Sequence, residues 1–181
     1  MFCITINHQY KFTMQKQKCL FLDRDGVINI DNGYTHKVKD LVLVDNIIET
    51  CLLAISRGYI VVIITNQAGI AKGYYTEEDF FTFMNEIYNV FSQHSILITK
   101  TYFCPYHPDA KIEKYKVNSF DRKPNPGMIL KAVNDFNIDV SKSILIGDNQ
   151  TDIQAGENAK IKTNILIKNN THDIAYYQKI F

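Results

Sequence analysis

Residues 18–29 read KCLFLDRDGVIN, a short apolar run that ends in two aspartates separated by one residue and followed by glycine. Side chains two positions apart on a strand point to the same face, so Asp23 and Asp25 are predicted to lie side by side at a strand end. One carboxylate can then attack an electrophile while the other transfers protons beside it. A solvated acidic turn is the alternative interpretation. A calcium loop is disfavoured because residues 27–34 lack the further oxygen ligands and the spaced glutamate that it needs.

Outward from this stretch, apolar runs alternate with helical patterns. Runs at 59–64, 96–103, 143–146 and 164–167 predict further strands, of which 59–64 has the unbroken apolar character of a parallel strand covered on both faces. Helices are predicted from Asp45 as N-cap to a stop at Gly58, from Thr76 with Asp79, from Asn125-Pro126 with the proline in the first turn to Phe136, and from about Thr151. The sequence therefore predicts an α/β fold: a doubly wound, Rossmann-like domain with a mostly parallel central sheet, helices on both faces and no large cap domain.

Polar motifs follow three of these strands at their carboxyl ends. Asp23 and Asp25 follow the first strand, Thr65-Asn66 the second and Asp148 the fourth. Ligands of doubly wound sheets bind beyond these ends, so the three motifs are expected to meet at one edge of the sheet.

The groups at this edge suit a phosphate and a hard metal ion. The Thr65 hydroxyl and the backbone N–H groups after it can bind phosphoryl oxygens, although a turn-capping threonine is the alternative. Residues 69–73 are expected to form a flexible basic loop around Lys72. Lys123 precedes a predicted helix and can neutralise phosphate charge. Asp148, with Asp152 near it, can bind Mg²⁺, which takes few protein carboxylates.

Four motifs together resemble the haloacid dehalogenase (HAD) superfamily of phosphotransferases. They read LFLDRDGVIN, IITNQAGIAKG, RKPNPGM and ILIGDNQTDI and follow one another in the proper order from Lys18 onward. NGYTHK and NQAGIAKGYYTEEDF resemble in particular the D-glycero-D-manno-heptose 1,7-bisphosphate 7-phosphatases, and the histidinol-phosphate phosphatases share the main motifs. A combination of this size is far more specific than any one of its motifs.

The resemblance implies a role for each matching residue. Asp23 would attack phosphorus and form an aspartyl-phosphate, while Asp25 would protonate the leaving oxygen and then deprotonate the hydrolytic water. The phosphate- and substrate-binding residues would be Thr65, Asn66 (through its backbone), Lys72, Arg122 and Lys123. Magnesium would be bound by Asp23, Asp148 and the backbone carbonyl of Asp25.

Two positions depart from the family pattern. Many relatives carry a zinc loop of the form C-x-H…C-x-C before R-K-P, but the matching positions here are Cys104, Tyr106, Ser119 and Asp121. A structural zinc normally needs four good ligands, so no structural zinc is predicted. The second departure is Asn149, where relatives often have a basic residue.

The altered loop leaves one metal alternative open. His107 is displaced by one residue from the family position and could form an improvised site with Cys104 and Asp121. Otherwise the loop is expected to be held by packing around Tyr106, Tyr115 and Phe120.

Composition limits the partners and the compartment. The 181 residues carry a net charge of +1 and are 46% hydrophobic, which gives no reason to expect nucleic acid or membrane partners. Cysteines without pairing spacing favour the reducing cytoplasm. Residues 1–17 are expected to be a poorly ordered extension of a single domain at 18–181. An edge strand at 2–6 is the alternative, and translation could start at Met1 or Met14.

The leading functional hypothesis is a magnesium-dependent, monomeric phosphatase that removes the C7 phosphate of a heptose 1,7-bisphosphate in ADP- or GDP-heptose biosynthesis. Histidinol-phosphate phosphatase is the alternative enzyme. A catalytically inactive scaffold is the alternative from another class. It is disfavoured because Asp23, Asp25, Thr65, Lys123 and Asp148 are all present.

Overall fold

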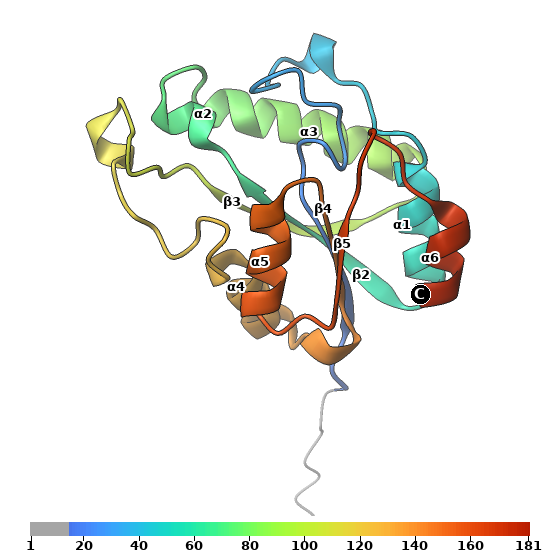
Figure 1. The fold of residues 1–181 in the computed structure, drawn as a ribbon. Coiled ribbons are helices and arrows are strands. Elements are labelled where there is room, and N and C mark those ends of the chain that lie inside the picture. The colour runs from blue at the N-terminus through green and yellow to red at the C-terminus, as the bar shows by residue number, and fades with distance from the viewer. Residues whose placement is uncertain (1–14) are drawn as a thin grey trace, which may run out of the picture.

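The computed structural model describes residues 15–181 and places a parallel five-stranded sheet at the centre of the molecule (Figure 1). The strand order is β3-β2-β1-β4-β5, so the strand that carries the paired aspartates is the central one. The strands are β1 (Lys18–Leu22), β2 (Tyr59–Asn66), β3 (Ile98–Cys104), β4 (Ile144–Gly147) and β5 (Thr163–Leu166). All four pairings are parallel, which confirms the predicted fold class.

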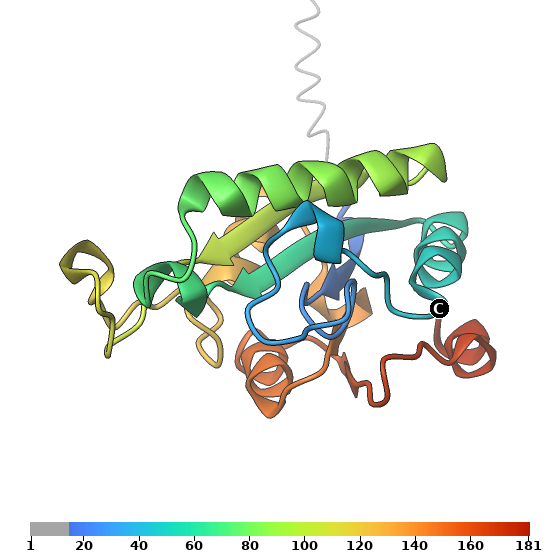
Figure 2. The same ribbon diagram turned by 90° about the horizontal axis from the view of Figure 1, so that it is seen from above.

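Helices cover both faces of the sheet, as the view from above shows (Figure 2). The α-helices are α1 (Ile47–Ser56), α2 (Ala68–Ala71), α3 (Glu77–Gln93), α4 (Gly127–Phe136), α5 (Gln150–Asn158) and α6 (Ile174–Ile180). Short 3-10 turns lie at Val38–Asp40, Glu113–Tyr115 and Val140–Lys142. Among the described residues, no helix is both long enough and apolar enough to cross a lipid bilayer.

Alternating side chains of the central strands form the two halves of the core. Leu20 and Leu22 of β1 pack with α1 and α3 on one face, whereas Cys19 and Phe21 pack with α4 and α5 on the other. All four side chains are fully buried. Burial on both faces explains why the strand reads as a continuous apolar run rather than as an alternating one.

Helix starts follow the sequence in two cases and depart from it in two. The helix predicted from about Thr151 is α5, which begins at Gln150. Thr76 and Asp79 form the expected capping box at the start of α3. The prediction of Asp45 as an N-cap was wrong, because Asn46 occupies that position in a left-handed conformation with φ 63°. Pro126 is the N-cap of α4 and not a first-turn residue, so that helix begins at Gly127.

Two further helices were not expected. The segment predicted to be a flexible basic loop contains α2, in which Gly69, Ile70 and Ala71 are buried. The C-terminal helix α6 begins after the N-cap Asp173, a start signal that the sequence analysis did not use, and packs near α1. The expected N-terminal extension lies largely outside the described residues. Within them, the Gln17 N–H donates to the Asn137 carbonyl.

Candidate active site

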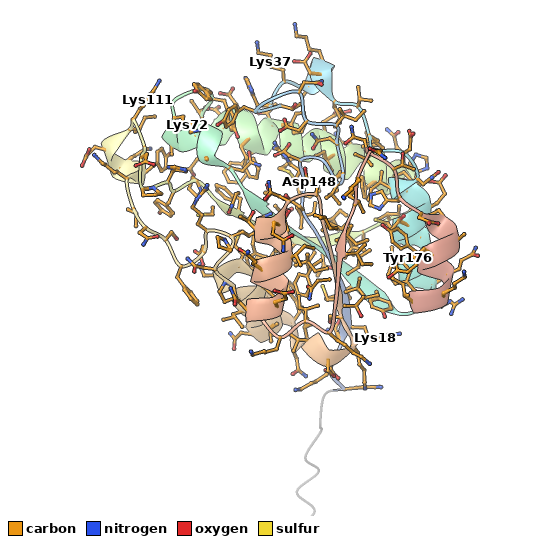
Figure 3. All side chains as sticks on the ribbon, viewed as in Figure 1. Lys18, Lys37, Lys72, Lys111, Asp148 and Tyr176 are labelled. Atoms are coloured by element: carbon orange, nitrogen blue, oxygen red, sulfur yellow. The ribbon has the colours of Figure 1, made fainter. Side chains whose placement is uncertain are left out.

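The carboxyl ends of β1, β2 and β4 bring the predicted motifs to one edge of the sheet. The backbone N–H of Asp23 donates to Ile146 O of β4 over 3.0 Å, so the ends of these two strands are joined directly. Asp148 lies at this edge above α5 (Figure 3). Gly26 adopts φ +77°, and a Cβ there would lie 2.1 Å from Asp148 Oδ2. Only glycine permits the loop after β1 to approach Asp148 this closely.

Lys123 is buried among oxygen atoms from three elements. Its Nζ lies 2.8 Å from Asp23 Oδ1 and 2.6 Å from Asp152 Oδ1, and it donates to Ile64 O over 3.0 Å. The side chain of Asn66 fixes the backbone of this lysine, because it donates to Lys123 O and accepts from Lys123 N. Burial alone would lower the pKa of Lys123, but Asp23 and Asp152 outweigh it and the pKa is raised. The lysine is therefore held in its charged form beside the predicted nucleophile.

The carboxylates of the site interact unfavourably with one another. Burial, followed by the charge of Asp152, raises the pKa of Asp23 to about 8, although Lys123 opposes this shift. Partial burial, followed by the negative charge of Asp152, also raises the pKa of Asp148 to about 6. This excess of negative charge is what a cation would relieve.

The donor set suits magnesium. One carboxylate oxygen from each of Asp23, Asp148 and Asp152 lies within 4.8 Å of the other two. Hard oxygen donors with room for water and phosphate are typical of Mg²⁺ sites. Asp152 is buried and also accepts from Asn149 N, and Asn149 is the N-cap of α5. Asn149, where relatives often have a basic residue, therefore caps α5 with its side chain.

The carboxylate of Asp25 is held by three neighbours that sequence analysis did not single out. Arg24 donates through Nη2 to Oδ1 over 2.6 Å and to Oδ2 over 2.7 Å. Asn29 Nδ2 donates to Oδ1 over 3.1 Å, and Gln67 Nε2 donates to Oδ2 over 3.0 Å. Arg24 is fully buried, and strand alternation could have indicated this, since it lies between two residues that face the site.

A second cationic region contains Lys72, which Figure 3 labels, and Arg122, the residue that precedes the buried Lys123. Lys72 Nζ donates to the Tyr34 hydroxyl over 2.5 Å, and this hydrogen bond raises the pKa of Lys72. Arg122 is half-buried, and burial lowers its pKa. The two cations act on each other electrostatically, so both predicted substrate-binding residues lie in one region.

The loop that departs from the zinc pattern is fastened by other contacts. His107 Nδ1 accepts from Asp109 N, and His107 N donates to Tyr115 O. Asp121 forms an ion pair with Lys131. Within residues 15–181, the one group of acidic, His or Cys side chains placed to hold a metal is that of Asp23, Asp148 and Asp152.

Aromatic packing in this loop was predicted correctly in part. The rings of Tyr106 and Tyr115 lie 6.1 Å apart, and the Tyr115 hydroxyl donates to Glu77 Oε1 over 2.6 Å. The prediction for Phe120 was wrong, because its side chain is 61% exposed. Its backbone carbonyl holds the loop instead, by accepting from Gly127 N over 3.1 Å.

Comparison with known proteins agrees with this geometry. A HAD-hydrolase-like family model matches residues 120–180. The chain is 49% identical to D-glycero-alpha-D-manno-heptose-1,7-bisphosphate 7-phosphatase of Burkholderia mallei, over 84% of this chain and 80% of that protein. It is 46% identical to the enzyme of the same name from Campylobacter jejuni, over 84% and 83%. A HAD-like phosphatase structure from Mesorhizobium loti matches with a TM-score of 0.83 and 27% identity, covering 91% of this chain and 84% of that one. The chain therefore belongs to the HAD superfamily, within the family of the heptose-1,7-bisphosphate 7-phosphatases.

Proposed function

We propose that this protein is a magnesium-dependent phosphatase that hydrolyses the C7 phosphate of D-glycero-D-manno-heptose 1,7-bisphosphate. The observation that carries the proposal is the 49% identity to a phosphatase of that name, over more than four fifths of this chain. The convergence of Asp23, Lys123 and Asp148 at one sheet edge supports it. Both compared enzymes are named for the alpha anomer, so we expect this chain to prefer that anomer.

The reaction is proposed to proceed in two displacements at phosphorus. A carboxylate oxygen of Asp23 attacks phosphorus, the bond from phosphorus to the C7 oxygen breaks, and Asp25 gives its proton to that oxygen. Water then attacks the aspartyl-phosphate and gives a proton to Asp25. The bond from phosphorus to Asp23 breaks, which releases phosphate and regenerates both carboxyl groups.

The remaining site residues bind and neutralise the phosphoryl group. The Thr65 hydroxyl and the Asn66 N–H are proposed to donate to its oxygens, and the buried Lys123 supplies positive charge. Mg²⁺ bound by Asp23, Asp148 and the Asp25 carbonyl would neutralise charge on the transferred group. Charge neutralisation and in-line positioning are the main requirements of phosphoryl transfer.

The second phosphate of the substrate is proposed to lie near Arg122 and Lys72. Both side chains are cationic. The carboxylates of Asp23 and Asp152 pair with Lys123 and not with these two cations. An anion at the far end of a sugar bisphosphate would therefore find unneutralised positive charge there.

The protein is further proposed to act as a cytoplasmic monomer without structural zinc. Cys19, Cys51 and Cys104 are buried and unpaired, which is compatible with a reducing compartment. Metal analysis of the purified protein is expected to give no stoichiometric zinc. One zinc per chain would contradict the assignment of the loop at 104–121.

The decisive experiment measures phosphate release with Mg²⁺ from both anomers of the heptose bisphosphate and from histidinol phosphate. Fast release from the alpha anomer, absent in Asp23→Asn, is the expected result. Asp23→Asn keeps the side-chain size and removes the nucleophilic carboxylate, so it is expected to abolish turnover without unfolding the protein.

Other outcomes would change the assignment. Preference for histidinol phosphate would place the same chemistry on a different substrate. Turnover near wild type in Asp23→Asn would remove Asp23 as the nucleophile. No release from any of the three esters would refute the proposed activity and favour a scaffold role.

A further inference from the structure

Gln67 connects the proposed acid–base residue to the interior of the protein. It follows β2 directly, and its side chain is 1% exposed. Its Nε2 donates to Asp25 Oδ2 over 3.0 Å and to Thr65 Oγ1 over 2.7 Å. One amide nitrogen therefore contacts both the carboxyl group of Asp25 and the hydroxyl group of Thr65.

The chemistry of its neighbours dictates which way this amide faces. Asp25 Oδ2 faces the amide as a hydrogen-bond acceptor that also accepts from Arg24 Nη2, so the amide nitrogen and not its oxygen is placed against Asp25. The Oε1 atom then faces Tyr75, whose hydroxyl donates to it over 2.5 Å. A reversed amide would place oxygen against an Asp25 oxygen and lose that hydrogen bond, whereas the hydroxyls of Thr65 and Tyr75 can donate or accept and fit either orientation.

Tyr75 is itself held in place by close packing against His36 and Gly69. Its ring is 6% exposed and stacks on His36, with ring centroids 4.7 Å apart and an interplanar angle of 16°. A Cβ on Gly69 would lie 2.2 Å from Tyr75 Cε1 and 2.8 Å from its hydroxyl oxygen. Glycine at position 69 thus provides the space that the tyrosine ring occupies.

We propose that Gln67 is a positioning residue that aims the Asp25 carboxyl group, and that Tyr75 aims Gln67. The inference rests on the proposed function, because Asp25 must exchange protons with the leaving oxygen and with water. Arg24 and Asn29 hold the carboxyl group from within the loop that bears it, whereas Gln67 holds it from the residue that follows the neighbouring strand β2. Gln67 therefore fixes where Asp25 lies relative to Thr65, which is the relation that proton transfer to a bound ester requires.

The test compares esters that differ in their need for a proton donor. Phenyl phosphate releases a phenol whose pKa is about 10, as in tyrosine. p-Nitrophenyl phosphate has a similar shape but releases a much weaker base, which leaves readily without a proton. Single-turnover rates of phenol release, together with KM, are measured with Mg²⁺ for the wild type, Gln67→Met and Tyr75→Phe.

Gln67→Met is expected to slow release from phenyl phosphate about tenfold more than release from p-nitrophenyl phosphate. The loss is smaller than the roughly 10²–10⁴-fold that general acid–base catalysis contributes, because Asp25 is still present and only its position is disturbed. Tyr75→Phe removes one hydroxyl and is expected to give a smaller selective loss in the same direction. KM is expected to stay within about twofold, since the Thr65 hydroxyl, the Asn66 N–H and Lys123 all remain in place to bind the phosphate.

The control is Tyr177→Phe, which also removes a buried tyrosine hydroxyl with a single partner, here His172 Nδ1 at 3.2 Å. It is expected to leave the ratio between the two esters unchanged. An equal loss on both esters in Gln67→Met, or a loss confined to KM, would overturn the proposal and leave Gln67 with a structural or phosphate-binding role.

The two phenyl esters need no heptose subsite, so the result is independent of the sugar. A wild type that hydrolyses them but not the heptose bisphosphate would refute the proposed substrate and still decide the role of Gln67. A wild type inactive on every ester would refute both proposals.

Discussion

Replacing Lys123 with methionine is expected to destabilise the protein severely, and more so at high pH. The ammonium group is buried between Asp23 and Asp152, whose side chains are 12% and 1% exposed. Methionine fills the space of the aliphatic stem but leaves two carboxylates facing each other without a cation. It also leaves the Ile64 carbonyl without its donor.

The size of the loss follows from the burial of the pair. Removing one partner of a buried ion pair typically costs about 3–5 kcal/mol, because the remaining charge is left uncompensated. For a chain of this length, such a loss lowers Tm by about 6–20 °C. The exposed ion pair of Lys100 with Asp135 is screened by solvent and contributes far less, so Lys100→Met serves as the control.

The dependence on pH follows from the raised pKa of Asp23. Its value of about 8 exceeds that of an unfolded aspartate, so the folded state binds more protons between about pH 4 and pH 8. Stability of the metal-free protein therefore falls as pH rises through this range. Without Lys123, which opposes the shift, the pKa of Asp23 rises further, so stability falls over a wider pH range.

The assay is urea unfolding with a chelator present, at pH 5 and pH 8. Lys123→Met is expected to lose about 3–5 kcal/mol at pH 8 and clearly less at pH 5, where Asp23 is protonated and leaves no uncompensated charge of its own. A loss below about 1 kcal/mol at pH 8, as expected for an exposed pair, or an equal loss at both pH values, would refute the reasoning.

Two further perturbations concern stability away from the site. Thr76→Ala removes the Oγ1 acceptor of the Asp79 N–H at the start of α3 and is expected to cost about 1 kcal/mol in thermal or urea unfolding; no measurable change would mean that the capping box contributes nothing. Burial lowers the pKa of His172, whose Nε2 lies 2.9 Å from Val27 O, so the unfolded chain takes up the proton first as pH falls below about 6.5. Stability is expected to decline below that pH, and less so in His172→Phe; parallel curves for the two proteins would contradict this.

Much of the fold could be predicted because its strongest signals are local. The apolar run at 59–64 predicted a buried parallel strand, and it is the core of β2. Thr76 and Asp79 predicted a capped helix since both partners lie within one turn. The helix α2 was missed because the burial of Gly69 and Ala71 depends on neighbours distant in the sequence. The N-cap at Asp45 and the helix start at Pro126 were misplaced by one residue, because the backbone path there also depends on the surrounding fold.

The sequence by itself determined which side chains meet at the edge of the sheet proposed to carry out phosphoryl transfer, because strand ends in a parallel sheet share an edge and the motifs identify those ends. Tertiary structure alone decided how these residues are charged and aimed. Lys123 lies between Asp23 and Asp152, which are 100 and 29 positions away in the sequence. Burial and the charges of these neighbours together set the pKa of Asp23. Gln67 reaches Asp25 across 42 positions of sequence. Electrostatic fields and hydrogen-bond directions depend on distance and burial in space, and these exist only once the chain has folded.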